Sequence, residues 1–262
     1  MQITRTEAPT GGPARTRREE IVPLNTGPRE VEPEQVIDFS ESEGWAWDSN
    51  PSVCTWDIQA AAIRSFIAPF EILDSQAAGE QADGDDDKGG IYSYGFSSLF
   101  LPFGSGADDG DLNSSNIEEK MAAFLARYGK DGKPQGGTEI MTAVMAADTH
   151  FFGEFGSRLR EQRPVRARVV WTDGALADET SFRAYLSQAV LSAEGYGAHG
   201  EWDEVWAIAI LGEQDGGGHG AYAQYRQLAA DHPWIHAYYF ENVVNPDEIA
   251  EDMAIAVIPV TA

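Results

Sequence analysis

Three short segments of the sequence supply the side-chain oxygens that hard cations prefer. The first contains Asp38, Ser40 and Ser42, spaced as Asp-x-Ser-x-Ser. The second delivers Thr138 directly after two glycines, and the third ends in Asp173. Two carboxylates and three hydroxyls suit Mg²⁺, which takes six oxygens at about 2.0–2.1 Å and tends to use only one or two carboxylates. Mn²⁺ suits the same oxygen shell. The residue types therefore predict one divalent-cation site for Mg²⁺ or Mn²⁺.

The composition of this donor set also predicts what the ion would do. Because few of the donors are anionic, the ion keeps excess positive charge and attracts an incoming carboxylate from another protein. The alternative is a metal-dependent hydrolase that acts on phosphate esters and uses Asp38 and Asp173 to hold its metal. That reaction needs a general base or a second metal, and the sequence places neither. A third possibility is a structural subunit of a larger assembly in which the metal is vestigial.

Other kinds of site find less support in the sequence. The chain has no Gly-x-x-x-x-Gly-Lys-Ser/Thr run, so a P-loop ATPase is excluded. The glycine-rich run at 216–220 could cradle a phosphate at a helix N-terminus, but it lacks both a lysine and the dinucleotide fingerprint. The five histidines lack zinc-ligand spacing, and a calcium loop that starts at Asp83 would need a glutamate where Tyr94 stands. We therefore predict no catalytic residues and no organic cofactor, and expect a protein that is not an enzyme.

The strongly acidic composition limits the possible partners. With 18 basic and 43 acidic residues, the formal net charge is −25, which disfavours binding to nucleic acid and to anionic membranes. No apolar run approaches the roughly 20 residues that a membrane span requires. The N-terminus has no apolar segment typical of a secretory signal, and the single cysteine, Cys54, cannot form an internal disulfide. These features together predict a cytoplasmic protein that binds other proteins.

The elements that must position the oxygen donors form an alternating series. Nearly continuous apolar runs at 36–40, 166–172, 205–211 and 234–240 indicate strands that are covered on both faces, as in a parallel sheet. Helical patterns separate these runs, so we predict an α/β fold with a doubly wound, mostly parallel central sheet and helices on both faces. The first of these helices is expected to begin at Asn50-Pro51 and to stop at Pro69.

The chain is expected to contain one domain. Residues 1–30 are rich in Pro, Gly, Thr, Arg and Glu and predict a flexible N-terminal arm, and residues 31–262 form the domain itself. The first strand ends in Asp38, Ser40 and Ser42, and a later strand ends in Asp173. Because the carboxyl ends of parallel strands meet at one edge of the sheet, these side chains should lie close together.

The three segments, in this order and in these contexts, resemble the metal-ion-dependent adhesion site of von Willebrand factor type A (vWA) domains. The resemblance covers about residues 31–262 and points to the intracellular bacterial members of the family. It implies a Rossmann-like vWA fold in which Ser40, Ser42 and Thr138 bind the metal through their hydroxyls. Asp38 and Asp173 would act directly or through bound water. An acidic side chain of a protein partner would then complete the coordination shell.

The sequence departs from common vWA members in the loops near the expected site. Acidic stretches at 80–87 and 107–111 and the segment 43–50 lengthen these loops. Within the last segment, Trp45 and Trp47 either form a rim that contacts a specific partner or pack against the first helix.

Overall fold

Five strands with long buried stretches form the parallel core of a seven-stranded sheet. They are β1 (Val31–Asp38), β2 (Ile91–Phe96), β5 (Val165–Thr172), β6 (Glu204–Gly212) and β7 (Ile235–Glu241). The strand order is β3-β2-β1-β5-β6-β7, and the two short strands β3 (Phe100–Pro102) and β4 (Asp111–Leu112) run antiparallel to β2. The computed structural model describes residues 31–48, 50–77, 90–104, 111–174, 176–193, 203–212, 218–232, 234–241 and 245–257.

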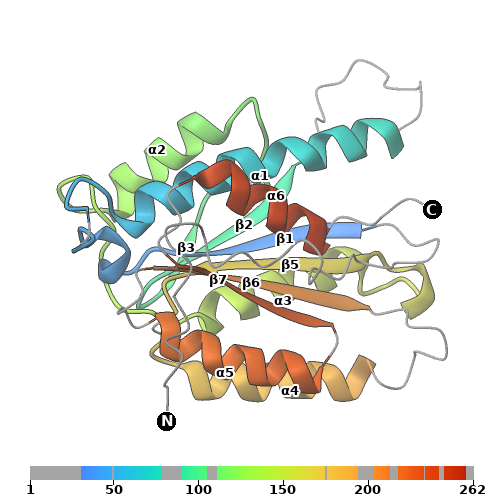
Figure 1. Cartoon of the computed structure of the whole chain (residues 1–262). Helices are drawn as coiled ribbons and strands as arrows, with labels where there is room; N and C mark the ends of the chain where they lie inside the picture. The colour runs from blue at the N-terminus through green and yellow to red at the C-terminus, as the bar shows by residue number, and fades with distance from the viewer. Residues whose placement is uncertain are drawn as a thin grey trace, which may run out of the picture.

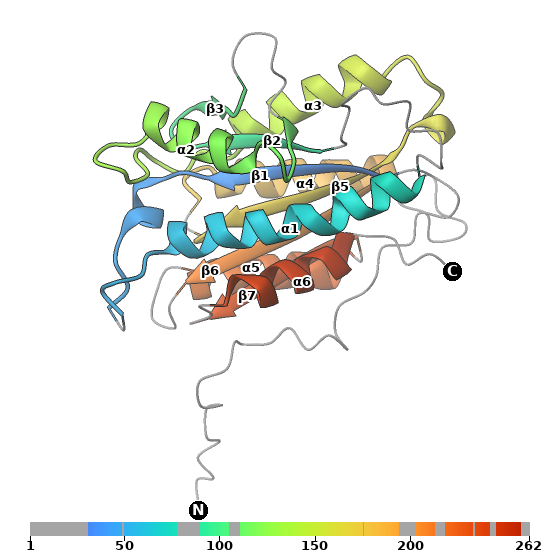
Figure 2. The ribbon, with the colours of Figure 1, turned by 90° about the horizontal axis from the view of Figure 1, so that it is seen from above.

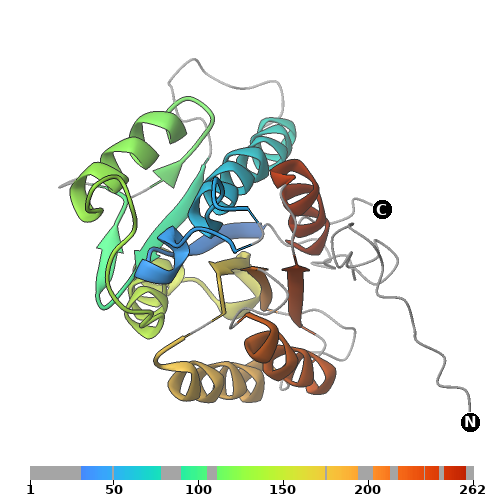
Figure 3. The same ribbon diagram turned by 60° about the vertical axis from the view of Figure 1, so that its left-hand side comes forward.

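Helices cover both faces of this sheet, as Figures 1 and 3 show. One face carries α1 (Thr55–Ala77), α2 (Ile117–Tyr128) and α6 (Pro246–Val257), and the other carries α3 (Met141–Phe155), α4 (Glu179–Ala193) and α5 (Gly218–Asp231). Figure 2 shows α1 and α6 lying side by side above β1, β5 and β6. The predicted doubly wound α/β fold is therefore confirmed.

The alternation of side chains along β1 explains why two helical layers are needed. Val36 belongs to the apolar core shared with α3, α4 and α5, whereas Ile37 and Phe39 belong to the core shared with α1, α2 and α6. Successive strand residues point to opposite faces. A strand whose odd-numbered and even-numbered residues are both apolar must therefore be covered on both faces, as the near-continuous apolar runs predicted.

The prediction for the first helix was wrong at both ends. Asn50-Pro51 forms a turn in which the Asn50 Oδ1 accepts a hydrogen bond from the Ser52 amide at 3.2 Å, and α1 begins only at Thr55. At the other end, α1 continues through Pro69 to Ala77. A proline inside a helix removes one backbone hydrogen bond and can kink the helix without ending it. Packing of α1 along α6 helps to sustain the longer helix (Figure 1).

A network of buried ion pairs lies between the sheet and the layer of α3 and α4, and we call it the paired cluster. Its members are Glu34 on β1, Arg166 and Arg168 on β5, Asp148 on α3 and Glu204 on β6. Arg168 is fully buried, and its Nε donates to Glu34 at 2.7 Å, while Arg166 donates to Glu34 at 2.9 Å and to Asp148 at 2.8 Å. Arg168 also pairs with Asp148 and, at 3.0 Å, with Glu204. The chain thus neutralises most of this buried charge internally.

None of the helices in the described part of the chain combines the length and hydropathy that crossing a membrane requires. Residues 1–30 and most of the two acidic stretches at 80–87 and 107–111 lie outside the described residues.

Candidate metal centre

The carboxyl end of β1 places Asp38 in the interior of the protein. Its side chain has no exposed surface, and its two carboxylate oxygens have different partners: Oδ1 accepts the Ser40 amide at 2.9 Å, and Oδ2 accepts the Thr172 hydroxyl at 2.8 Å. The Gln59 side-chain amide of α1 donates to the Asp38 carbonyl at 2.8 Å. These contacts connect the ends of β1 and β5 where the strand order reverses, which is where open α/β sheets bind ligands.

The two serines follow in a short 3₁₀ helix, η2 (Glu41–Gly44), for which Ser40 is the N-cap residue. The Ser40 and Ser42 hydroxyl oxygens lie 3.1 Å apart. Neighbouring ligands of an octahedral ion whose bonds are about 2.1 Å long lie about 3.0 Å apart. The spacing of the two hydroxyls therefore fits two adjacent positions on one Mg²⁺ or Mn²⁺ ion.

The glycine pair before Thr138 permits a close approach to the end of β2. Gly136 has φ of +96°, and a Cβ atom at this position would lie 3.0 Å from the Ser97 hydroxyl. Gly137 donates its amide to the Ser98 hydroxyl at 2.7 Å. The Gly136 carbonyl in turn accepts the Glu41 amide at 3.0 Å, so the segment that carries Thr138 lies directly beside η2.

The third segment is held in place from both ends. Gly174 has φ of +91° and donates its amide to the Thr172 hydroxyl at 3.0 Å, which turns the chain sharply after Asp173. Farther along, the Asp178 carboxylate accepts the amides of Ile140 and Met141 at 3.0 and 2.8 Å. A carboxylate at the start of α3 is favoured by the unpaired amides of the helix terminus. Asp178 thereby ties the Asp173 loop to the segment that carries Thr138.

Glu43 is a site residue that the sequence analysis missed. One carboxylate oxygen from each of Asp38, Glu43 and Asp173 lies within 4.8 Å of the other two. Glu43 is fully buried, and no side chain among the described residues donates a hydrogen bond to its carboxylate; the backbone amide of Asp173 is the donor that opposes the rise in its pKa. In a 3₁₀ helix, side chains three residues apart share a face, so Glu43 follows Ser40 into the site. The available signal was this spacing from Ser40, but it is readable only once the turn is known to be 3₁₀.

Burial and mutual repulsion shape the electrostatics of these three carboxylates, which we call the acidic cluster. Burial, followed by the charge of Asp173, raises the pKa of Asp38 to about 8, against the opposing effect of hydrogen bonds from Ser40 and Thr172. Burial, followed by the charges of Asp173 and Asp38, raises the pKa of Glu43 well above its ordinary value. Within the described residues, no lysine or arginine forms an ion pair with Asp38 or Glu43. A bound cation would supply the missing positive charge.

The structure brings the predicted site residues to one place. Asp38 and Asp173 belong to the acidic cluster, Ser40 and Ser42 contact each other, and the Thr138 segment is hydrogen-bonded to η2. Asp38, Ser40 and Thr138 are buried, whereas Ser42 and Asp173 are partly exposed, so the site opens towards solvent on one side.

The two tryptophans after the serines have different environments. Trp47 is buried, and its indole N–H donates to the Thr55 hydroxyl at 3.1 Å at the start of α1. Trp45, by contrast, is 64% exposed. Leu99, in the β2–β3 turn next to Ser98, is 68% exposed. One tryptophan therefore packs against the first helix, while the other lies at the rim of the site.

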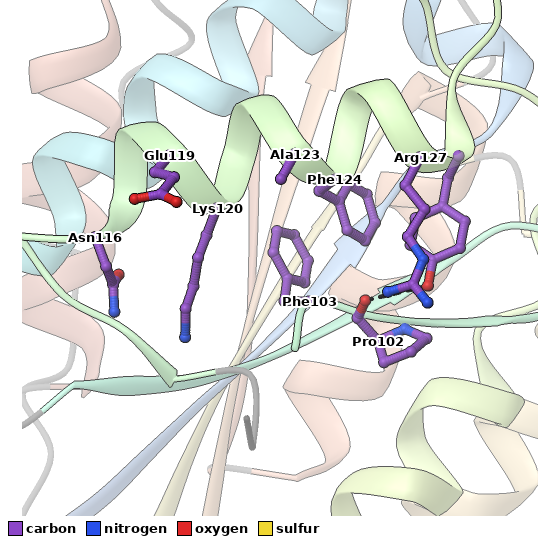
Figure 4. A pocket seen from close by; sticks show the side chains of 9 residues that line it. Pro102, Phe103, Asn116, Glu119, Lys120, Ala123, Phe124 and Arg127 are labelled. Atoms are coloured by element: carbon purple, nitrogen blue, oxygen red, sulfur yellow. Dashed lines mark hydrogen bonds between the residues drawn. The ribbon is translucent and has the colours of Figure 1, made fainter. Parts of the chain in front are cut away.

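A cavity of about 260 Å³ lies between α2 and the β3 region, and none of the predicted metal ligands lines it. Figure 4 shows its aromatic wall and the basic side chains Lys120 and Arg127 at its edges. Phe103 and Phe124 stack there with ring centroids 3.9 Å apart, so this wall is part of the core. The cavity is thus separate from the acidic cluster.

Comparisons with known proteins place the fold. The crystal structure of the manganese-loaded TRAP protein of Plasmodium vivax matches 87% of this chain and 74% of its own, with a TM-score of 0.51 and 13% sequence identity. An aerotolerance-related membrane protein from Bacteroides fragilis, in a form with multiple mutations to serines, covers 87% of this chain and 98% of its own, with a TM-score of 0.42 and 16% identity. No protein-family model matches the chain, and no curated protein sequence is significantly similar to it. The likeness to TRAP supports a vWA-like fold.

Proposed function

We propose that this protein binds one Mg²⁺ or Mn²⁺ ion among Asp38, Ser40, Ser42, Thr138 and Asp173. The bound ion then captures a protein partner through an acidic side chain of that partner. The observation that carries the proposal is the acidic cluster, in which buried Asp38 and Glu43 have no lysine or arginine partner among the described residues. Burying ionised carboxylates without compensation is costly, and a divalent cation offsets this cost.

The geometry of the surrounding hydroxyls supports the same proposal. The 3.1 Å spacing of the Ser40 and Ser42 oxygens fits adjacent ligand positions, and the acidic oxygens lie close enough to share one ion. Opposite ligands of an octahedral ion with bonds of about 2.1 Å lie about 4.2 Å apart. TRAP, a protein of similar fold, was crystallised loaded with manganese, which supports a divalent cation as the ligand.

Exposed apolar side chains beside the site support a protein partner. Trp45 is the C-cap residue of η2 and donates its amide to the Ser42 carbonyl at 3.1 Å, and Leu99 lies in the turn whose Ser98 hydroxyl accepts the Gly137 amide. Exposed aromatic and aliphatic groups next to a charged centre are the features of a protein-binding surface.

Affinity capture of partners from lysate tests this proposal. Capture should require added Mg²⁺ or Mn²⁺, disappear in EDTA, and disappear in D38N even with the metal present. The W45A variant should recover less partner, whereas L159A should behave as wild type, because Leu159 is similarly exposed at 61% but follows α3 at the opposite edge of the sheet. Equal recovery with and without EDTA would contradict the proposal.

The phosphate-ester hydrolase is a second candidate because Glu43 supplies an acidic group that the sequence analysis did not place at the site. Beside a bound metal, its carboxylate could accept a proton from an attacking water. Turnover of generic phosphate esters with Mn²⁺ that is lost in both D38N and E43Q would favour this candidate. The absence of turnover by a protein that binds Mn²⁺ would exclude it for the esters tested.

A further inference from the structure

The position of Glu43 would allow its carboxylate to act as an additional metal ligand that the chain itself provides. It is the third residue of η2, and its carboxylate is buried within 4.8 Å of oxygens from Asp38 and Asp173. The next residue, Gly44, packs closely on the Lys133-Pro134 segment, because a Cβ atom there would lie 3.2 Å from Pro134. This packing helps to bury Glu43 beside Asp38 and Asp173.

With Glu43 included, the chain offers enough side-chain donors to fill the coordination shell of the ion. The two aspartates, two serines and one threonine proposed as ligands provide five side-chain donors, and Glu43 brings the number to six. If all six bound the ion directly, they would complete the octahedral shell of Mg²⁺ without a water or a partner. Three ionised carboxylates around a doubly charged ion also give the centre a net negative charge. Such a centre no longer attracts an acidic side chain.

The contacts of Glu43 show why it can still leave the ion. No side chain among the described residues donates a hydrogen bond to its carboxylate, and the backbone amide of Asp173 is the donor that opposes the rise in its pKa, so few contacts hold the side chain in place. It also projects from a four-residue 3₁₀ helix, whose hydrogen-bond geometry is poorer than that of an α-helix. The bound ion would be the main group that retains this carboxylate.

We propose that Glu43 is an internal ligand that occupies, on the bound cation, the position that a partner's carboxylate takes during capture. This inference rests on the proposed function, and it adds regulation to it: a partner binds only by displacing Glu43. The site is therefore closed in the free protein, and removal of Glu43 opens it to any small carboxylate.

The test uses Mn²⁺ as the ion and acetate as the carboxylate. Calorimetry measures Mn²⁺ affinity, and water-proton relaxation measures the number of exchangeable waters on the bound ion. In E43Q, the Mn²⁺ affinity should fall by about 10- to 100-fold, a range that even the loss of outer-shell partners produces. The bound ion should gain one water, and acetate should displace that water in E43Q but not in wild type.

Two further variants separate coordination from charge and from folding. E41Q removes an equal charge from an exposed position in the same turn and should match wild type in every measurement. E43D keeps the charge but withdraws the oxygens by one methylene, and it should also admit the extra water. Thermal unfolding in chelator confirms that each variant is folded.

Wild-type affinity and water number in both E43Q and E43D would overturn the role of Glu43 and leave the cation site intact. An equal response of wild type and E43Q to acetate would overturn it as well. If neither wild type nor E43Q takes up Mn²⁺, the proposed function itself fails, and this inference fails with it.

Discussion

The acidic cluster and the paired cluster both involve carboxylates on the same face of β1, Asp38 and Glu34 respectively, but they differ in how the buried charge is compensated. Glu34 and Asp38 are four residues apart on β1, and each faces a partner on β5. At Glu34 the β5 partners are Arg166 and Arg168, whereas at Asp38 the partner is the neutral hydroxyl of Thr172. Each cluster contains three carboxylates; arginines pair with those of the paired cluster, whereas Asp38 and Glu43 have no lysine or arginine partner among the described residues.

This difference explains why we place the proposed cation at the acidic cluster and not at the paired cluster. Glu34 loses its hydration on burial, which raises its pKa, but it gains two guanidinium partners that offset part of this cost. Asp38 and Glu43 are equally buried and are compensated only by hydrogen bonds. The first arrangement is a structural element of the sheet, and the second is the arrangement expected of a binding site.

The largest expected change is a loss of folding stability when one arginine of the paired cluster is removed, so that its carboxylates lack a partner as those of the acidic cluster do. R168M removes a fully buried guanidinium and leaves Glu34, Asp148 and Glu204 with Arg166 as the remaining arginine of the cluster. Breaking a buried pair in this way costs about 3–5 kcal/mol, measured as a lower urea midpoint at constant slope. R183M, which breaks the partly exposed pair with Glu179, should cost about 0.5 kcal/mol or less. Similar losses in the two variants would contradict this account.

The next prediction tests whether a bound cation stabilises the carboxylates of the acidic cluster, as the arginines stabilise those of the paired cluster. Mn²⁺ at 100 times its dissociation constant should raise the free energy of unfolding by about 2.7 kcal/mol relative to chelator. D38N should lose most of this increase because Asp38 is central to the cluster. Thermal unfolding with and without Mn²⁺ measures the difference. An undiminished increase in D38N would place the ion elsewhere.

The paired cluster should also make the stability of the protein depend on pH, through Glu204. Burial raises the pKa of Glu204 from 4.5 to about 7, although the charge of Arg168 opposes this shift. The folded state therefore holds this proton to a higher pH than the unfolded state. The stability that results is fully present below about pH 4.5 and is lost as the pH rises through 7.

Urea unfolding at a series of pH values measures this contribution. Between pH 4.5 and 7, the decline of stability should be shallower in E204Q than in wild type by about 2–3 kcal/mol. Parallel profiles for the two proteins would show that Glu204 does not titrate in this range.

The smallest expected effect has the opposite sign to that of R168M. In chelator, E43Q should be as stable as wild type or more stable by about 1 kcal/mol, because the substitution removes a buried acid to which no described side chain donates a hydrogen bond. Urea unfolding measures the difference. A loss of more than about 1 kcal/mol would mean that Glu43 makes a stabilising contact within the protein.

The sequence predicted the fold well where physical signals were local. The apolar runs of β5 and β6 identified strands buried on both faces, and the carboxyl ends of β1 and β5 were correctly expected to bring Asp38 and Asp173 together. The limits of α1 were missed because Pro69 continues the helix, a result of packing rather than of propensity.

Within the site, the sequence indicated the residues that recur in a known motif but not Glu43. A glutamate after a serine-rich turn is ordinarily exposed, as Glu41 is. Glu43 is buried because η2 is a 3₁₀ helix packed against the Lys133-Pro134 segment, and this contact links distant parts of the chain. The arginines of the paired cluster were likewise read as part of an apolar strand, because their partners lie on other elements.

A crystal of the protein grown with Mn²⁺ and measured at a wavelength sensitive to manganese would show whether the acidic cluster holds a metal ion. We expect one anomalous peak enclosed by the Ser40 and Ser42 hydroxyls, with Asp38, Asp173 and Glu43 around it. An empty acidic cluster at a Mn²⁺ concentration that saturates calorimetric binding, or a peak at another place, would contradict it.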